Sequence, residues 1–102
     1  MSNNKFTSFK EFYPYYLSEH KNSTNKLLHM LGSLIGLSIV ISLITLELYN
    51  YILIALIPGY FFAWIGHFIF EKNKPATFKY PLYSFLGDWV MLKDIIIGKV
   101  EI

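Results

Sequence analysis

Two long runs without charged residues constrain the fold of this chain more than any other feature of its sequence. No Asp, Glu, Lys or Arg occurs in residues 27–46 or in residues 48–70, which are runs of 20 and 23 residues separated by Glu47. An α-helix needs about 20 mainly apolar residues to cross a bilayer. Neither run shows the periodic polar positions of a half-exposed soluble helix. We therefore predict two membrane-spanning helices, and the short connection between them forces an antiparallel hairpin.

The composition agrees with this prediction and excludes several other classes of protein. Charged residues make up 16% of the 102 residues, against about 25% in an average soluble domain. The chain has no cysteine, which excludes disulfides and thiolate metal sites. Its net charge is only +2, so we expect no nucleic-acid partner, because such proteins carry a clustered basic face. A soluble hairpin with buried apolar helices remains the alternative.

The flanks of the hairpin are predicted to be helical as well, within a single membrane domain over residues 1–102. Residues 6–25 form an aromatic-rich N-terminal segment that suits the headgroup region of a bilayer. Residues 71–81 contain two prolines and predict an ordered loop. Apolar residues recur at helical spacing over 82–97, which predicts an amphipathic helix on the membrane or on the hairpin. The predicted fold class is all-α, an integral membrane helical hairpin (two transmembrane helices) with amphipathic flanking helices.

The lysines predict the orientation of the hairpin. Four lysines precede the first run, five follow the second, and the connection between the runs has none. The positive-inside rule then places both termini in the cytoplasm. The membrane would be the plasma or inner membrane in a bacterium and the endoplasmic reticulum in a eukaryote.

The only three histidines of the chain are predicted to meet a glutamate at one level of the hairpin. His29 and His67 stand at equal distances from the turn, so an antiparallel hairpin gives them equal depth at its cytoplasmic end. Glu71 follows His67 by four residues and would share its helix face. His20 can fold back to the same point through a bend at residues 22–25, where Ser23, Thr24 and Asn25 offer an N-cap. Ionisable groups at membrane depth are costly and tend to be functional.

This combination of side chains suits a metal ion. Imidazole with carboxylate fits iron, manganese or zinc, and two histidines with one carboxylate and open positions are typical of non-haem Fe(II). The candidate catalytic and metal-binding residues are His20, His29, His67 and Glu71. Asn25 and Asp88, with Glu19, are candidates to hold the imidazole N–H groups. The plainer alternatives are that Glu71 pairs with a nearby lysine and that Asp88 is only the polar side of its helix.

Two functions of other classes remain open from the residues alone. The first is a haem-binding membrane protein with His29 and His67 as axial ligands, which a Soret absorption band would reveal. The second is a non-catalytic membrane adaptor, in which the polar cluster merely ties the hairpin to its flanks. The adaptor predicts purified protein without metal.

Two motifs give the chain a resemblance to a known family. The first, H-x4-N-x3-H, runs from His20 through Asn25 to His29, and the second, G-H-x3-E-x3-P-A, runs over residues 66–76. Both motifs, in this order and separated by a hydrophobic hairpin, resemble the membrane 2-hydroxy fatty acid dioxygenase family. That family includes a yeast enzyme of fatty-acid alpha-oxidation and compact bacterial relatives. The resemblance covers about residues 13–91.

The resemblance implies an enzyme with Fe(2+) as cofactor and a 2-hydroxy fatty acid and O2 as substrates. The products would be the fatty acid one carbon shorter and CO2. By motif position, His20, His29 and His67 match the essential histidines of the family, and Glu71 matches the acidic position after them. This chain is shorter than the yeast-type protein and lacks a second pair of spans, so a homodimer that closes the site is a further expectation.

The expected location of the substrate is inferred only from where residues stand along the two predicted spans and their flanks. The acyl tail is expected along Leu31, Leu34, Phe61 and Ile65. The carboxylate of the substrate is expected near Lys72, Lys74 or Lys79.

Overall fold

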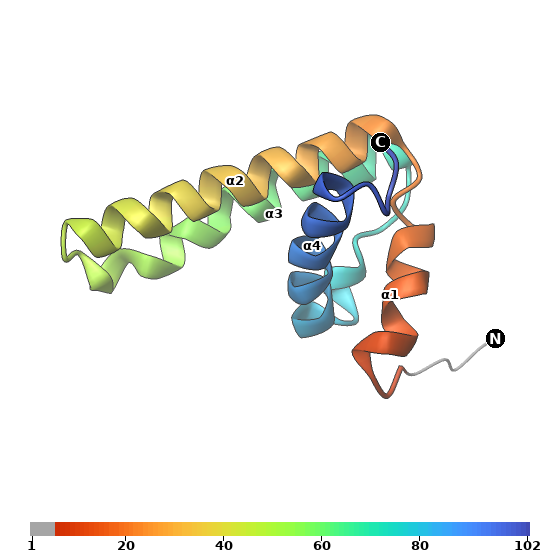
Figure 1. The fold of residues 1–102 in the computed structure, drawn as a ribbon, viewed down its shortest axis with the longest axis horizontal. Helices are drawn as coiled ribbons and strands as arrows, with labels where there is room; N and C mark the ends of the chain where they lie inside the picture. Colours follow the sequence, from red (N-terminus) through yellow and green to blue (C-terminus); the bar gives the residue numbers. More distant parts are fainter. Residues whose placement is uncertain (1–5) are drawn as a thin grey trace.

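The computed structural model describes residues 6–102 as a helical protein (Figure 1). In chain order its elements are α1 (Phe9–Ser18), α2 (Ser23–Thr45), the 3₁₀ helix η1 (Tyr49–Ala55), α3 (Leu56–Ile65), the π-helical segment η2 (Gly66–Glu71), the 3₁₀ turn η3 (Ala76–Phe78) and α4 (Pro81–Ile96). Residues 1–5, among them one lysine counted for the orientation, lie outside this description. No strand occurs within residues 6–102, so the all-α prediction is confirmed.

A long hairpin is the main feature of the fold (Figure 1). Its first arm is α2, and its second arm is the run of η1, α3 and η2. Both arms, Ser23–Thr45 and Tyr49–Glu71, are long and apolar enough to cross a membrane, with mean hydropathies of 2.2 and 1.9. The chain reverses between them at Glu47, whose φ of 58° lies in the left-handed region.

Two glycines let the arms pack closely. A Cβ at Gly32 would lie 2.8 Å from the carbonyl oxygen of Pro58, and one at Gly36 would lie 2.7 Å from the carbonyl oxygen of Ala55. Small residues at such positions allow helix backbones to approach each other, which favours helix pairing in membranes. The close contact fixes the register of the two arms.

The second arm changes its helical type along its length. Pro58 lies in the first turn of α3, where a missing backbone N–H costs little. At the other end, α3 passes into the wider π-helical segment η2, which ends at Lys72 in the left-handed region with φ 61°. Such π segments are frequent at functional sites, and this one carries His67.

The flanking helices α1 and α4 lie side by side across one end of the hairpin (Figure 1). Their shared core contains Phe12, Tyr16 and Met91, which are almost completely buried. A Cβ at Gly87 would lie 2.9 Å from the ring of Tyr16, so α4 approaches that ring closely. The hydroxyl of Tyr13 donates a hydrogen bond to Oδ2 of Asp94 at 2.7 Å. These contacts hold both flanks as one body against the hairpin.

The chain bends between α1 and α2, so that His20 faces back toward the hairpin. Asn22 caps α2, because its side-chain oxygen accepts a hydrogen bond from the backbone N–H of Asn25 at 3.1 Å. The prediction that Ser23, Thr24 and Asn25 supply the N-cap is therefore wrong by one residue. Asn25 itself is fully buried in the first turn of the helix, because its side chain is used at the site described next.

Candidate metal centre

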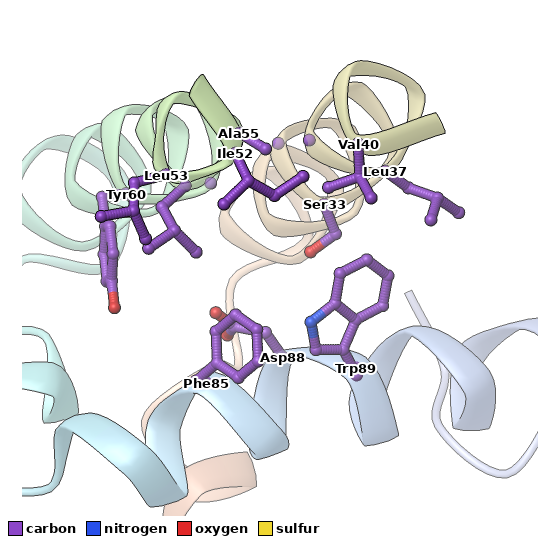
Figure 2. Close-up of a pocket in the computed structure, with 14 residues that line it drawn as sticks. Ser33, Leu37, Val40, Ile52, Leu53, Ala55, Tyr60, Phe85, Asp88 and Trp89 are labelled. Atoms are coloured by element: carbon purple, nitrogen blue, oxygen red, sulfur yellow. The ribbon is translucent and has the colours of Figure 1, made fainter. Parts of the chain in front are cut away.

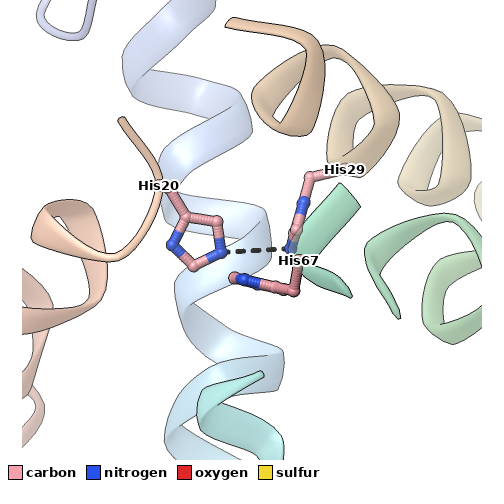
Figure 3. Close-up of side chains that lie close together, drawn as sticks. All are labelled: His20, His29 and His67. Atoms are coloured by element: carbon pink, nitrogen blue, oxygen red, sulfur yellow. Dashed lines mark hydrogen bonds between the residues drawn. The ribbon is translucent and has the colours of Figure 1, made fainter. Parts of the chain in front are cut away.

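Three of the four predicted metal ligands come together in one buried cluster (Figure 3). His20 comes from the bend after α1, His29 from α2 and His67 from η2. One ring nitrogen of each lies within 4.8 Å of those of the other two. Their side chains are between 1% and 4% exposed. The ring centroids are 4.5–5.0 Å apart and the ring planes are nearly perpendicular, at 78–88°.

Backbone carbonyls fix the rings of two of these histidines. Nδ1 of His20 lies 2.5 Å from the carbonyl oxygen of Tyr16, and Nδ1 of His29 lies 2.9 Å from that of Asn25. A carbonyl oxygen can only accept a hydrogen bond. Both rings must therefore carry their hydrogen on Nδ1, which leaves Nε2 with a free lone pair.

A side-chain amide fixes the third ring in the same way. Nδ1 of His67 lies 2.7 Å from Oδ1 of Asn73. The amide of Asn73 is itself oriented, because its Nδ2 donates to the carbonyl oxygen of Glu19 at 3.1 Å. Its oxygen therefore faces His67, and His67 also keeps its hydrogen on Nδ1. Asn73 was not predicted to be a site residue, because its position in the sequence does not distinguish it from an ordinary loop residue.

Each of the three imidazoles thus brings one ring nitrogen into one buried space, and each has its free lone pair on Nε2. Nε2 of His20 and Nε2 of His29 are only 3.1 Å apart, and with both hydrogens on Nδ1 neither can donate to the other. Facing lone pairs repel each other unless a cation lies between them. Burial, and next the two neighbouring imidazoles, hold the pKa of His20 well below its ordinary value, so this ring stays in the neutral form that metals bind. The donor set fits a divalent transition metal.

Tyr16 and Asp88 complete one side of the cluster. The ring of Tyr16 stacks on His20 with centroids 4.0 Å apart and planes 25° apart. Its hydroxyl donates a hydrogen bond to Oδ1 of Asp88. The same oxygen lies 3.8 Å from Nε2 of His29. Removal from solvent raises the pKa of Asp88 to about 7, although the hydrogen bond from Tyr16 works against this shift. Tyr16 was not predicted as a site residue, although it precedes His20 by four residues, a spacing that brings two side chains together on a helix.

The residues predicted to hold the imidazole N–H groups take different positions. Asn25 holds His29 through its backbone carbonyl and not through its side chain. Glu19 acts one step away, by accepting from the amide of Asn73. Asp88 lies beside Nε2 of His29, which is the side where a metal would bind, and not beside the N–H.

Glu71 lies outside the group of converging nitrogen atoms. Its carboxylate accepts hydrogen bonds from the backbone N–H of Lys21 at 3.3 Å, the backbone N–H of Asn22 at 2.9 Å and Nδ2 of Asn25 at 3.1 Å. Glu71 therefore ties the bend before α2 to the end of the second arm. The direct ligand role expected for Glu71 is not seen in this geometry.

The cluster leaves no room for a haem between His29 and His67. Their ring centroids are 5.0 Å apart, and the ring of His20 lies 4.5 Å from each. A flat macrocycle would have to separate the two rings and displace the third. The geometry instead suits a single ion that is held by three nitrogen atoms.

The comparison with known families agrees with the motifs. The model of the Mpo1-like family, described as "2-hydroxy-palmitic acid dioxygenase Mpo1-like", matches residues 6–100. The chain therefore belongs to this family, as its two motifs predicted. Neither the curated proteins nor the solved structures gave a match.

Proposed function

We propose that this chain is an Fe(II)-dependent membrane dioxygenase of fatty-acid alpha-oxidation. A 2-hydroxy fatty acid and O2 would give the acid one carbon shorter, CO2 and water, a reaction that balances without an external reductant. The observation that carries the proposal is the convergence of three neutral imidazole nitrogens in a buried space. The family description supplies the substrate class. When bound, the metal would activate O2 and orient the substrate.

In this proposal His20, His29 and His67 hold the metal, and the residues around them keep the rings in place. Tyr16, Asn25 and Asn73 accept the Nδ1 hydrogens, so each ring can present only Nε2 to an ion. Asp88 stands next to the ligand atoms and can accept a hydrogen bond from the hydroxyl group of a bound 2-hydroxy acid. Glu71 contributes by bracing the bend that carries His20.

We also propose that the hairpin spans a bilayer with both termini on the cytoplasmic side. Only 22% of the apolar window of each arm is buried inside the protein, whereas the core helix of a soluble protein would be mostly covered. Large apolar side chains therefore face outward along both arms, where lipid can cover them. The flanks α1 and α4 cross the end of the hairpin (Figure 1), as helices at a membrane surface would. Every lysine within residues 6–102 lies before the first arm's apolar run or after the second arm, and so at the end of the hairpin that carries α1 and α4.

Metal content tests the proposal first. Protein purified without oxygen, supplied with Fe(II) and washed should retain about one iron per chain by mass spectrometry. His67→Ala should lose the metal, and Trp64→Phe, which changes an outward-facing residue of the same arm, should keep it. Wild-type protein that is folded and binds no metal would remove the site and leave the adaptor. A Soret band in the purified protein would instead support haem.

Turnover tests the reaction itself. A 2-hydroxy fatty acid labelled with ¹³C at its carboxyl carbon should release labelled CO2 and an equal amount of the acid one carbon shorter. One O2 should be consumed for each CO2. Iron that is bound stoichiometrically without any product would keep the metal site and refute this substrate class.

A further inference from the structure

An apolar groove opens beside the histidine cluster, between the hairpin and α4 (Figure 2). It has a volume of about 250 Å³. Its wall on the hairpin includes Ser33, Val40, Ile52 and Tyr60, and its wall on α4 includes Phe85 and Trp89. Among its lining residues only Asp88 carries a charged group.

Asp88 joins the groove to the histidine cluster. Its carboxylate lines the groove and lies 3.8 Å from Nε2 of His29. Ser33, one helical turn after His29, lines the same end, and Figure 2 shows its hydroxyl and the carboxylate of Asp88 both pointing into the space between the hairpin and α4. The groove therefore has a polar end at the candidate metal site.

The other end of the groove is wholly apolar and lies toward the turn of the hairpin. From Ser33 to Val40, α2 advances about 10 Å. An extended alkyl chain built from bonds of about 1.5 Å covers that length with about eight carbons. Val40 on α2 and Ile52 on η1 line this far end.

We propose that this groove holds the acyl tail of the 2-hydroxy acid, with the carboxyl end at the histidines and the tail toward Val40 and Ile52. The size of these two side chains then sets the preferred length of the tail. The inference rests on the proposed function for its substrate class. It is favoured because Asp88, the one charged residue of an otherwise apolar lining, lies 3.8 Å from Nε2 of His29, so the carboxyl end of the acid can reach the cluster while its tail stays among apolar side chains.

The groove replaces the tail position expected from the sequence. None of Leu31, Leu34, Phe61 and Ile65 lines it. Leu31, Leu34 and Phe61 are 45%, 45% and 56% exposed, so they face outward. These four residues were chosen from their positions along the two apolar runs. Such positions do not show which face of the hairpin α4 covers, and that face is where the groove lies.

Fluorescence of Trp89 tests whether the groove is occupied. The chain has two tryptophans, and Trp64 lies apart from the groove, near Phe61 and Phe68. In Trp64→Phe protein in lipid nanodiscs, loaded with Fe(II) without oxygen, a sixteen-carbon 2-hydroxy acid brominated at mid-chain should quench Trp89. This quenching should saturate and should be reversed by the unbrominated acid. Trp89→Phe protein, which keeps only Trp64, should show weaker quenching that does not saturate. If Trp89 also fails to saturate, the acid only partitions into lipid and the proposal is wrong.

Substitution at the far end tests the role in chain length. Val40→Phe should lower the preference for a sixteen-carbon over an eight-carbon 2-hydroxy acid by about tenfold, read as a ratio of kcat/KM. The matched control is Ile41→Phe, because Ile41 is on the same helix, is 56% exposed and does not line the groove. Equal preferences in the two variants would overturn the role of Val40.

The two measurements separate this inference from the proposed function. Saturable quenching of Trp89 without turnover would refute the dioxygenase and keep the groove, and the length preference can then be read from quenching midpoints. Turnover without saturable quenching would refute the groove and keep the dioxygenase.

Discussion

The hydrogen bond from His67 to Asn73 offers the sharpest prediction about the metal centre. Asn73→Ala removes the acceptor that holds Nδ1 of His67 at 2.7 Å and leaves all three proposed ligands in place. A net hydrogen bond contributes about 0.5–1.5 kcal/mol, and about 1.4 kcal/mol is a tenfold change in affinity. Loss of a partner behind a metal-binding histidine weakens affinity by about 10–100-fold. Because the freed ring can also turn and change its tautomer, we expect at least a tenfold loss.

The assay is competition for Fe(II) with a coloured chelator in the absence of oxygen. Asn50→Ala serves as the matched control, because Asn50 is an exposed amide in η1, near the turn at the far end of the hairpin. It should bind Fe(II) like the wild type. Asn73→Ala protein with wild-type helix content and wild-type iron affinity would refute the reasoning, since His67 would then need no orientation or would not bind the metal.

Three further predictions concern the scaffold of the site. Glu71→Gln keeps only one acceptor oxygen, so it can retain the two hydrogen bonds made to Oε1 without their charge but not the one made to Oε2. It should lower the free energy of unfolding by about 1 kcal/mol and keep the metal, and a loss of metal with unchanged stability would support Glu71 as a direct ligand. Gly87→Ala forces a Cβ against a buried aromatic ring at 2.9 Å and should cost about 1–3 kcal/mol, whereas Gly59→Ala, whose Cβ would meet nothing within 4 Å, should be tolerated in the same thermal melts. The hydrogen bond from Tyr13 is the main cause that lowers the pKa of Asp94 in the folded protein. The stability that this hydrogen bond adds is therefore fully present above the ordinary pKa of about 3.9, and it is lost as the pH falls through the lowered pKa of the folded state. Tyr13→Phe should therefore destabilise the protein at pH 7 and much less at pH 2, and an equal effect at both pH values would exclude the ionic contribution.

The hairpin could be predicted from the sequence because two continuous apolar runs, each long enough for a membrane-spanning helix, are separated by a short connection. The two runs correspond to the two arms of the hairpin, although α2 begins at Ser23, four residues before the apolar run. Equal spacing from the turn likewise brought His29 and His67 together. These inferences depend only on the lengths of the runs and on residue spacing from the turn, both of which can be read directly from the sequence. The path of α4 over the hairpin depends on side-chain packing, so the groove was not predictable.

The position of Glu71 shows where helix geometry itself misleads. A spacing of four residues places two side chains on one face of an α-helix, which is why Glu71 was expected beside His67. The segment from Gly66 to Glu71 is instead a π-helix, whose turns contain more residues. Four residues cover slightly more than one turn of an α-helix and slightly less than one turn of a π-helix, so the change of helix type rotates Glu71 about the axis relative to His67. The carboxylate of Glu71 accepts hydrogen bonds from the bend before α2, and only His67 contacts the other histidines.

The two sequence motifs prove to be one interlocked unit. Asn25, the middle residue of the first motif, accepts from His29 with its backbone carbonyl and donates to Glu71 of the second motif with its side chain. Gly66, the first residue of the second motif, packs directly on Asn25, where a Cβ would collide with the amide. The first motif therefore contributes His20 and His29, and the second contributes His67. The second motif also holds Asn25 of the first motif in place, because Gly66 leaves room for its side chain and the carboxylate of Glu71 accepts its hydrogen bond. Because each motif completes the other, their joint presence is informative even though neither contains a metal-binding pattern of its own.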